Sequence, residues 1–168
     1  MTKIKICGLK RPEDIRAVNE AQPDFAGFVN APLDLVAGLL NDGTITVAQL
    51  HGHEDEDYLA ALRALAPGRE LWKAFKIRSE DDLAAAAAST ADQILLDNGY
   101  GTGQTFDWSL AGGVRRPFLL AGGLTPENIP DAVAQLHPMG LDLSSGVETD
   151  RQKDRTKILA AVAAARKE

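Results

Sequence analysis

The sequence predicts an α/β fold in which parallel strands curl into a barrel. Short apolar segments alternate with segments of helical spacing along the 168 residues, and this alternation favours a parallel sheet with helices outside it. Polar residues or glycines follow at least five of the apolar segments. Ligand groups in parallel α/β folds lie at the carboxyl ends of the strands, so their spread over many strands favours a barrel over an open, doubly wound sheet.

Seven strands are expected, because seven short runs rich in aliphatic residues are bounded by polar residues or glycines. They are placed at residues 4–7, 25–29, 46–50, 71–77, 93–96, 118–121 and 140–143. No Gly-x-Gly-x-x-Gly motif follows any of these runs. The absence of that motif weakens a dinucleotide-binding alternative.

Helices are expected between the strands, where apolar residues recur at three- and four-residue intervals. They are placed at residues 11–21, 30–40, 55–65, 80–88, 108–110, 126–136 and 153–166. Before the sixth helix, Thr125 is expected to act as the cap, with Pro126 at the first helical position and Glu127 in the first turn.

Composition indicates one domain, residues 1–168, with an aliphatic core, because hydrophobic residues make up 45% of the chain and aromatic residues only 5%. The net charge of −6 argues against a nucleic-acid partner or an anionic membrane surface. No apolar run could span a bilayer, and the polar amino-terminal stretch lacks a signal-peptide core. A single cysteine, Cys7, fits a reducing cytoplasm, so a cytoplasmic location is expected.

Two residues at strand ends have the chemistry of an acid–base pair. Cys7 is either a small buried hydrophobe or a thiolate base or nucleophile at the barrel mouth. Asp97 either caps its loop or acts as a general acid, and the apolar run directly before it suggests partial burial that would raise the pKa of its carboxyl group. Such a pair suits proton transfer between two substrate atoms, which is the chemistry of an isomerase.

Other polar residues at the strand ends are candidates for substrate binding. Gln49 and His51 close the third strand, and a hydrogen bond from His51 to a substrate is plausible from that position. Asp142 is expected to point into the barrel or toward the ligand, or else to accept hydrogen bonds from loop amides. Cys7, His51 and His53 lack a metal-ligand spacing, so no metal is expected.

Two glycine-containing loops follow the last two strands. Gly122 and Gly123 form either an ordinary turn or a cradle whose backbone N–H groups approach a phosphate. Ser145 and Gly146 belong to the second loop. In eight-stranded barrels the loops after the last two strands commonly bind phosphate, so the two loops together indicate a phosphate site.

Five motifs follow one another along the chain: Lys5-Ile6-Cys7-Gly8-Leu9, Gln49-Leu50-His51-Gly52, Leu96-Asp97, Leu120-Ala121-Gly122-Gly123-Leu124 and Gly140-Leu141-Asp142-Leu143-Ser144-Ser145-Gly146-Val147-Glu148. In these motifs and their order the chain resembles the phosphoribosylanthranilate isomerases of tryptophan biosynthesis. The resemblance runs from Lys3 to the last helix.

This resemblance implies a (βα)8-barrel enzyme that converts N-(5′-phosphoribosyl)anthranilate to 1-(2-carboxyphenylamino)-1-deoxyribulose 5-phosphate by an Amadori rearrangement. By matching motif, Asp97 resembles the acid that opens the ribose ring, and Cys7 resembles the base that removes the C2′ proton. Gly122, Gly123 and the Ser145-Gly146 loop resemble the phosphate-binding loops. Neither a metal nor an organic cofactor is expected.

One departure from the family lies near residues 28–30. The strand beginning at Phe25 passes at once into Val29-Asn30, as if from the end of the second strand to the end of the third. About one βα unit, roughly 30 residues, is missing there, which predicts a truncated, seven-stranded barrel. Two alternatives to a real deletion remain. In one, the printed sequence omits a segment that the protein contains, and in the other, residues 25–30 form one strand that merges the second and third.

The lost unit matters for activity and assembly. In the family it carries the arginine that holds the anthranilate carboxylate, and no other arginine of this chain matches that motif. A folded barrel that keeps the phosphate site but is weakly active or inactive is therefore the alternative function, and a different phosphosugar enzyme is a third. Seven strands cannot keep the closure of eight, so the barrel either reseals with seven strands or leaves two edges open. If the deletion is real, open strand edges favour a homo-oligomer.

Overall fold

The computed structural model describes residues 2–7, 12–26, 33–43, 45–52, 54–97, 108–111 and 113–166. Seven strands in these ranges form one sheet, and every paired neighbour runs parallel. They are β1 (Lys3–Ile6), β2 (Phe25–Ala26), β3 (Val47–Leu50), β4 (Glu70–Lys76), β5 (Gln93–Asp97), β6 (Phe118–Ala121) and β7 (Gly140–Leu143). The sheet order β2-β1-β7-β6-β5-β4-β3 confirms the predicted parallel α/β architecture.

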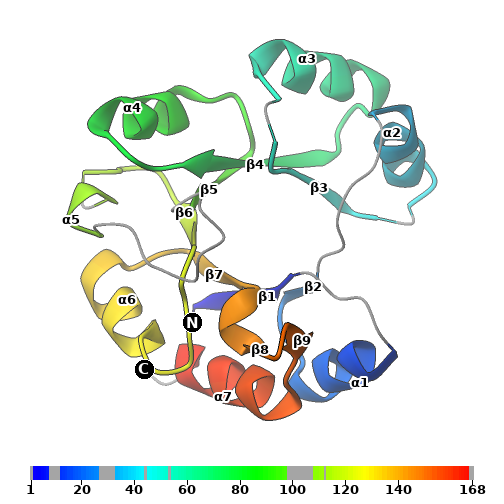
Figure 1. The fold of residues 1–168 in the computed structure, drawn as a ribbon. Helices are drawn as coiled ribbons and strands as arrows, with labels where there is room; N and C mark the ends of the chain where they lie inside the picture. Colours follow the sequence, from blue (N-terminus) through cyan, green and yellow to red (C-terminus); the bar gives the residue numbers. More distant parts are fainter. Residues whose placement is uncertain are drawn as a thin grey trace.

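Seven α-helices in the described ranges lie around the outside of the curled sheet (Figure 1). They are α1 (Pro12–Ala21), α2 (Leu33–Asn41), α3 (Glu56–Leu65), α4 (Glu80–Ala88), α5 (Trp108–Ala111), α6 (Ile129–Leu136) and α7 (Arg155–Ala165). Each follows a strand, as the alternating pattern predicts. None of the helices within these ranges is long and apolar enough to cross a lipid bilayer.

Side-chain caps fix the first residues of α3, α4 and α7. The Asp55 carboxylate accepts the Tyr58 N–H before α3, and the Ser79 hydroxyl accepts the Asp82 N–H before α4. Asp154 accepts two backbone N–H groups in the first turn of α7. These side chains occupy the cap position and satisfy N–H groups that have no partner within the helix. The regular helix therefore starts one residue later than predicted for α3, two residues later for α7, and at the predicted residue for α4.

The predicted start of α6 is wrong by three residues. Residues 126–128 form a turn, and the regular helix begins at Ile129. The N–H groups of Asn128 and Ile129 both donate to the Thr125 carbonyl, while the Asn128 side chain accepts the Thr125 N–H at 2.8 Å. Thr125 therefore starts a separate turn, because Pro130 at the beginning of α6 cannot donate a backbone hydrogen bond there.

Apolar side chains fill both faces of the sheet. The larger layer lies between the sheet and the helices and includes Ile4, Leu96 and Ile158. A smaller cluster inside the barrel consists of Trp72, Ala74, Leu95, Leu119 and Ala121, with partly buried Phe25, Val47 and Met139 packed against it. Apolar side chains therefore pack part of the barrel interior, as in other parallel barrels.

The sheet has two end strands, β2 and β3. Among the described residues these two strands do not pair with each other. The predicted strand over residues 25–29 is described only as β2, and the rest of it, with the predicted start of the second helix, lies outside the described residues.

A small antiparallel hairpin, β8 (Glu148–Thr149) and β9 (Gln152–Lys153), follows β7 and the 3₁₀ turn η1 (Ser145–Val147). Its turn residues Asp150 and Arg151 both have positive φ, 52° and 60°. Sequence analysis did not predict this hairpin, because neither residue is the glycine that signals such a turn.

Candidate active site

The two residues predicted to carry the chemistry lie at the same end of the sheet. Cys7 directly follows β1, and Asp97 is the last residue of β5. All seven strands run parallel, so the carboxyl ends of both strands face the same side of the barrel. The Cys7 N–H donates to the Leu143 carbonyl at 2.8 Å, which ties this residue to the end of β7. Cys7 is a half-buried free cysteine.

Asp97 pairs with a histidine from a neighbouring loop. The His51 Nε2 atom lies 3.0 Å from Asp97 Oδ2. The Asp97 side chain is only 14% exposed, against 48% for His51. The contact with His51 therefore restrains the orientation of a carboxylate that is largely buried. Both residues were predicted for this end of the sheet, but their contact was not.

Asp142 lies inside the barrel, as predicted, and is held by two donors. The Lys5 ammonium group donates to Asp142 Oδ2 at 2.7 Å, and Gln49 Nε2 donates to the same oxygen at 3.3 Å. Lys5 and Asp142 are paired residues of the adjacent strands β1 and β7. Lys5 was not among the predicted site residues, although strand alternation places residue 5 on the same face of β1 as residue 7.

The two candidate phosphate loops lie against each other. Gly122 and Gly123 after β6 have φ values of 84° and 67°, a conformation that side chains other than glycine rarely adopt. After β7, a Cβ atom on Gly146 would lie 1.8 Å from the Leu124 carbonyl oxygen. The backbones of the two loops therefore meet at a contact that only glycine permits, and both loops can face one anion.

A buried lysine braces the loop after β7. The Lys153 side chain is only 2% exposed, and its ammonium group donates to the Ser144 carbonyl at 3.0 Å and to the Glu148 carboxylate at 2.6 Å. Ser144 immediately precedes Ser145 and Gly146, so Lys153 fixes the base of this loop. Its role was not predicted, because the lysine lies on the unpredicted hairpin β8–β9.

No metal site is found in the part of the chain that the structure describes, where no three His, Cys, Asp or Glu side chains gather around one point. His53, considered above as a metal ligand, and residues 98–107 after Asp97 lie outside the described residues.

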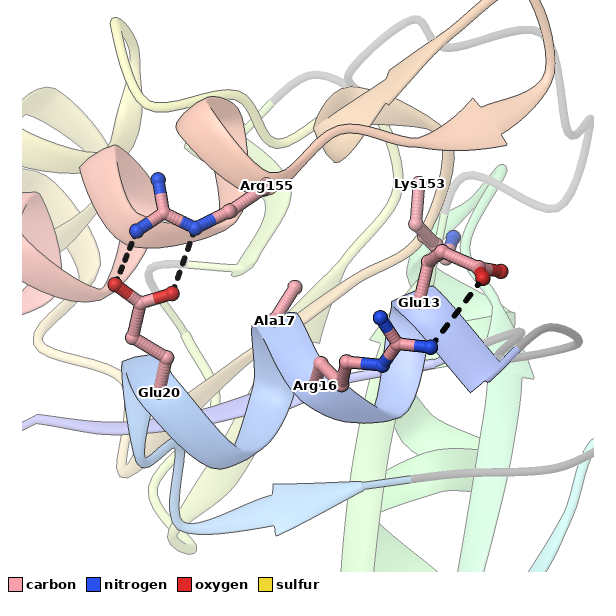
Figure 2. Close-up of a pocket in the computed structure, with 6 residues that line it drawn as sticks. All are labelled: Glu13, Arg16, Ala17, Glu20, Lys153 and Arg155. Carbon is pink, nitrogen blue, oxygen red and sulfur yellow. Dashed lines mark hydrogen bonds and ion pairs between the residues drawn. The ribbon is translucent and has the colours of Figure 1, made fainter.

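A separate groove lies on the outer wall between α1 and α7 (Figure 2). Its charged side chains pair with one another or with nearby carboxylates. Arg155 of α7 makes two hydrogen bonds to Glu20 of α1, and Arg16 lies 3.7 Å from Glu13. Because these charged side chains pair with one another, they do not mark the groove as a ligand site.

A family model and curated relatives point to the same family. A model of the N-(5′-phosphoribosyl)anthranilate (PRA) isomerase family matches residues 10–164. The N-(5′-phosphoribosyl)anthranilate isomerase of Endomicrobium trichonymphae is 39% identical over 198 residues, covering 96% of this chain and 97% of the relative. The isomerase of Acetivibrio thermocellus is 37% identical over 203 residues, covering 94% and 93%.

Solved structures agree with the sequence comparison. The phosphoribosyl anthranilate isomerase of Thermotoga maritima superposes with a TM-score of 0.83 at 29% identity, and 98% of each chain is covered. A phosphoribosyl anthranilate isomerase in complex with reduced 1-(o-carboxyphenylamino)-1-deoxyribulose 5-phosphate superposes with a TM-score of 0.80 at 27% identity, over 98% of each chain. The chain therefore belongs to the N-(5′-phosphoribosyl)anthranilate isomerase family.

Proposed function

We propose that this chain catalyses the isomerisation of N-(5′-phosphoribosyl)anthranilate to 1-(2-carboxyphenylamino)-1-deoxyribulose 5-phosphate in tryptophan biosynthesis. The observation that carries the proposal is the arrangement at one end of the parallel sheet. Cys7, Asp97 and two touching glycine loops gather there in a chain whose residues 10–164 match the family. An acid, a base and an anion site are the groups that this reaction requires.

Asp97 is the proposed general acid. It donates a proton to the ribose ring oxygen, the C1′–O4′ bond breaks, and the nitrogen lone pair forms a C1′=N double bond. Asp97 suits this role because its carboxylate is mostly buried and is oriented by His51 at 3.0 Å. A positioned acid of this kind typically contributes about 10²- to 10⁴-fold to the rate.

Cys7 is the proposed general base. Its thiolate removes the C2′ proton, and the electrons of the C–H bond form a C1′=C2′ bond while the C1′=N pair returns to nitrogen. The resulting enolamine becomes the ketone when C1′ gains a proton and the C2′ hydroxyl loses one, so no net redox change occurs. Cys7 is half-buried at the end of β1, within reach of the barrel mouth.

Substrate binding is assigned to residues around this pair. We assign the phosphate to the backbone of Gly122, Gly123, Ser145 and Gly146, and the sugar to Gln49, His51 and Asp142. The touching loops support the first assignment, and the contacts of His51 with Asp97 and of Gln49 with Asp142 support the second. No cofactor is required, because acid and base together complete the proton transfers.

A weakly active barrel is a second candidate, favoured by a specific observation. The alignment with the Endomicrobium trichonymphae isomerase extends over 198 positions, 30 more than the 168 residues of this chain. At least 30 residues of that relative therefore have no counterpart here. A deletion of one βα unit near residues 28–30 would remove the anthranilate-binding arginine, and a lost hydrogen bond to a charged group costs about 1.5–3 kcal/mol.

We also propose that the chain forms a homo-oligomer through β2 and β3. These end strands are unpaired with each other among the described residues, and edge strands offer N–H and C=O groups to another chain. Sedimentation velocity over a hundredfold concentration range should show a dimer or larger species. A monomer at every concentration would contradict this proposal.

Turnover of N-(5′-phosphoribosyl)anthranilate, followed by the fluorescence of its anthranilate group, tests the function directly. The parent protein should turn over, whereas Cys7→Ala and Asp97→Asn should lose about 10²- to 10⁴-fold in kcat. If both variants retained the parent's activity, the catalytic assignment would be wrong. A parent that binds the reduced product analogue without turnover would identify the weakly active barrel.

A further inference from the structure

Lys5 is a buried charged residue that the mechanism above does not use. Its side chain is 8% exposed, and that of its partner Asp142 is 6% exposed. The two residues sit opposite each other on β1 and β7, and their charged atoms are 2.7 Å apart. Burying two charges costs desolvation energy that the pair must offset, so a buried ion pair is weak support for stability and a reason to look for another role.

Both donors to the Asp142 carboxylate use the same oxygen. Lys5 Nζ and Gln49 Nε2 both donate to Oδ2. The other oxygen, Oδ1, is buried and has no hydrogen-bond partner among the described residues. Two donors, from β1 and β3, hold Oδ2 and restrict rotation of the carboxylate, so Oδ1 is held in one direction.

An unpaired, buried carboxylate oxygen is rare, because the missing hydrogen bond is costly. The position of Asp142 indicates which group could donate a hydrogen bond to Oδ1. Asp142 lies in the barrel interior on β7, the strand that leads directly into the Ser145-Gly146 loop assigned to phosphate. A sugar phosphate bound there presents hydroxyl groups, which are hydrogen-bond donors of the kind that Oδ1 lacks.

We propose that Lys5 is a positioning residue: its ion pair with Asp142 Oδ2 holds Asp142 Oδ1 ready to accept a hydrogen bond from a substrate hydroxyl. This inference rests on the proposed function, since it assumes a sugar-phosphate substrate. Lys5 itself does not touch the substrate. Without Lys5, the Asp142 carboxylate would be free to rotate, and rotation misplaces the acceptor oxygen.

The test compares Lys5→Met, Lys5→Arg and the control Lys3→Met. Lys3 lies on the same strand, is exposed and contacts the Phe25 ring rather than Asp142. With kcat and KM measured separately, Lys5→Met should lower kcat/KM at least about tenfold, the scale of a lost charged hydrogen bond. Lys5→Arg should recover at least half of the kcat/KM that Lys5→Met loses. Lys3→Met should have the same kcat/KM as the parent.

A double variant separates positioning from a general loss of structure. If Lys5 acts through Asp142, Lys5→Met should cause no further loss of kcat/KM in an Asp142→Asn background. If the losses in kcat/KM from the two substitutions multiply in the double variant, the inference is overturned. A folded Lys5→Met protein with a kcat/KM within twofold of the parent's would also overturn it. If Lys5→Met alone does not fold, the comparison of Asp142→Asn with the double variant still decides, because the double variant leaves no unpaired charge in the interior.

Binding of the reduced product analogue distinguishes this inference from the proposed function. A parent without turnover contradicts the function, whereas weaker analogue binding by Lys5→Met than by Lys3→Met still supports the inference. A parent that neither turns over nor binds the analogue overturns both. A parent that turns over, with a fully active Lys5→Met variant, overturns only the inference.

Discussion

The Phe25 ring stands edge-on to Trp72, with ring centroids 4.9 Å apart and an interplanar angle of 77°. Phe25 belongs to β2 and Trp72 to β4, which are not neighbours in the sheet. The contact therefore crosses the barrel interior beside the two unpaired end strands. Edge-to-face rings have a favourable quadrupole interaction in addition to their apolar contact.

Replacing Phe25 with alanine should destabilise the fold. Because Phe25 is only partly buried, we expect a loss of about 2–3 kcal/mol in the free energy of unfolding, below the range for fully buried aromatic residues. Urea unfolding followed by circular dichroism measures the change. Phe25→Leu keeps apolar volume and should lose less than half as much. Equal losses for the two variants would show that the aromatic contact has no special role.

His51 should matter less than Asp97 and should act through it. We expect His51→Ala to reduce kcat by about 10-fold, against about 10²- to 10⁴-fold for Asp97→Asn, because His51 orients the acid without replacing it. In the Asp97→Asn background, His51→Ala should have no further effect on kcat, although KM can still change through its contact with the sugar. Steady-state kinetics of the single and double variants provide the measurement.

The control for His51 is another histidine. His137 is an exposed residue at the end of α6 with φ of 45°, a conformation that asparagine also tolerates. His137→Asn should therefore keep the parent's kcat. A His51→Ala protein as active as His137→Asn would remove His51 from the site.

Local sequence patterns predicted the strands, most helix starts and the residues at the carboxyl ends, because alternation and caps act over a few residues. The contacts inside the barrel could not be predicted in this way. Phe25 meets Trp72, and Lys5 meets Asp142 across 137 positions, only because the sheet curls and fixes its register. Strand alternation could have placed Lys5 on the inward face, but not named its partner.

Stability in acid should depend on Glu56 at the start of α3. Its carboxylate accepts hydrogen bonds from the Ser89 hydroxyl at 2.7 Å and the Thr90 N–H at 3.0 Å. Desolvation raises the pKa of Glu56, but the hydrogen bonds from Thr90 and Ser89 outweigh it and lower this pKa below its ordinary value of 4.5. A lowered folded-state pKa adds stability above the unfolded value, and that stability is lost as the pH falls through the folded value.

Glu56→Gln should therefore lower stability at neutral pH and flatten the loss of stability below pH 4.5. Unfolding midpoints measured in urea from pH 7 to pH 3 check both effects. Asp57→Asn is the matched control, because it removes a carboxylate from the same first turn of α3. If both variants changed the pH dependence equally, general helix-terminal charge rather than the Ser89 and Thr90 contacts would be responsible.

Gly146 should be intolerant of even a methyl group. A Cβ atom there would overlap the Leu124 carbonyl oxygen, at 1.8 Å, and backbone atoms cannot yield as a flexible side chain can. Gly146→Ala should push the loops after β6 and β7 apart and weaken binding of the reduced product analogue at least about tenfold, consistent with one lost charged hydrogen bond. Titration calorimetry with the analogue and with inorganic phosphate measures the loss.

Gly38→Ala is the control for this substitution. Gly38 lies in α2, where a Cβ atom would meet nothing within 4 Å. Alanine there should raise the free energy of unfolding by about 0.5–1 kcal/mol, because it restricts the unfolded chain and favours the helix. Ligand binding should be unchanged in Gly38→Ala. If Gly146→Ala also bound phosphate and analogue like the parent, the loop after β7 would not be part of the phosphate site.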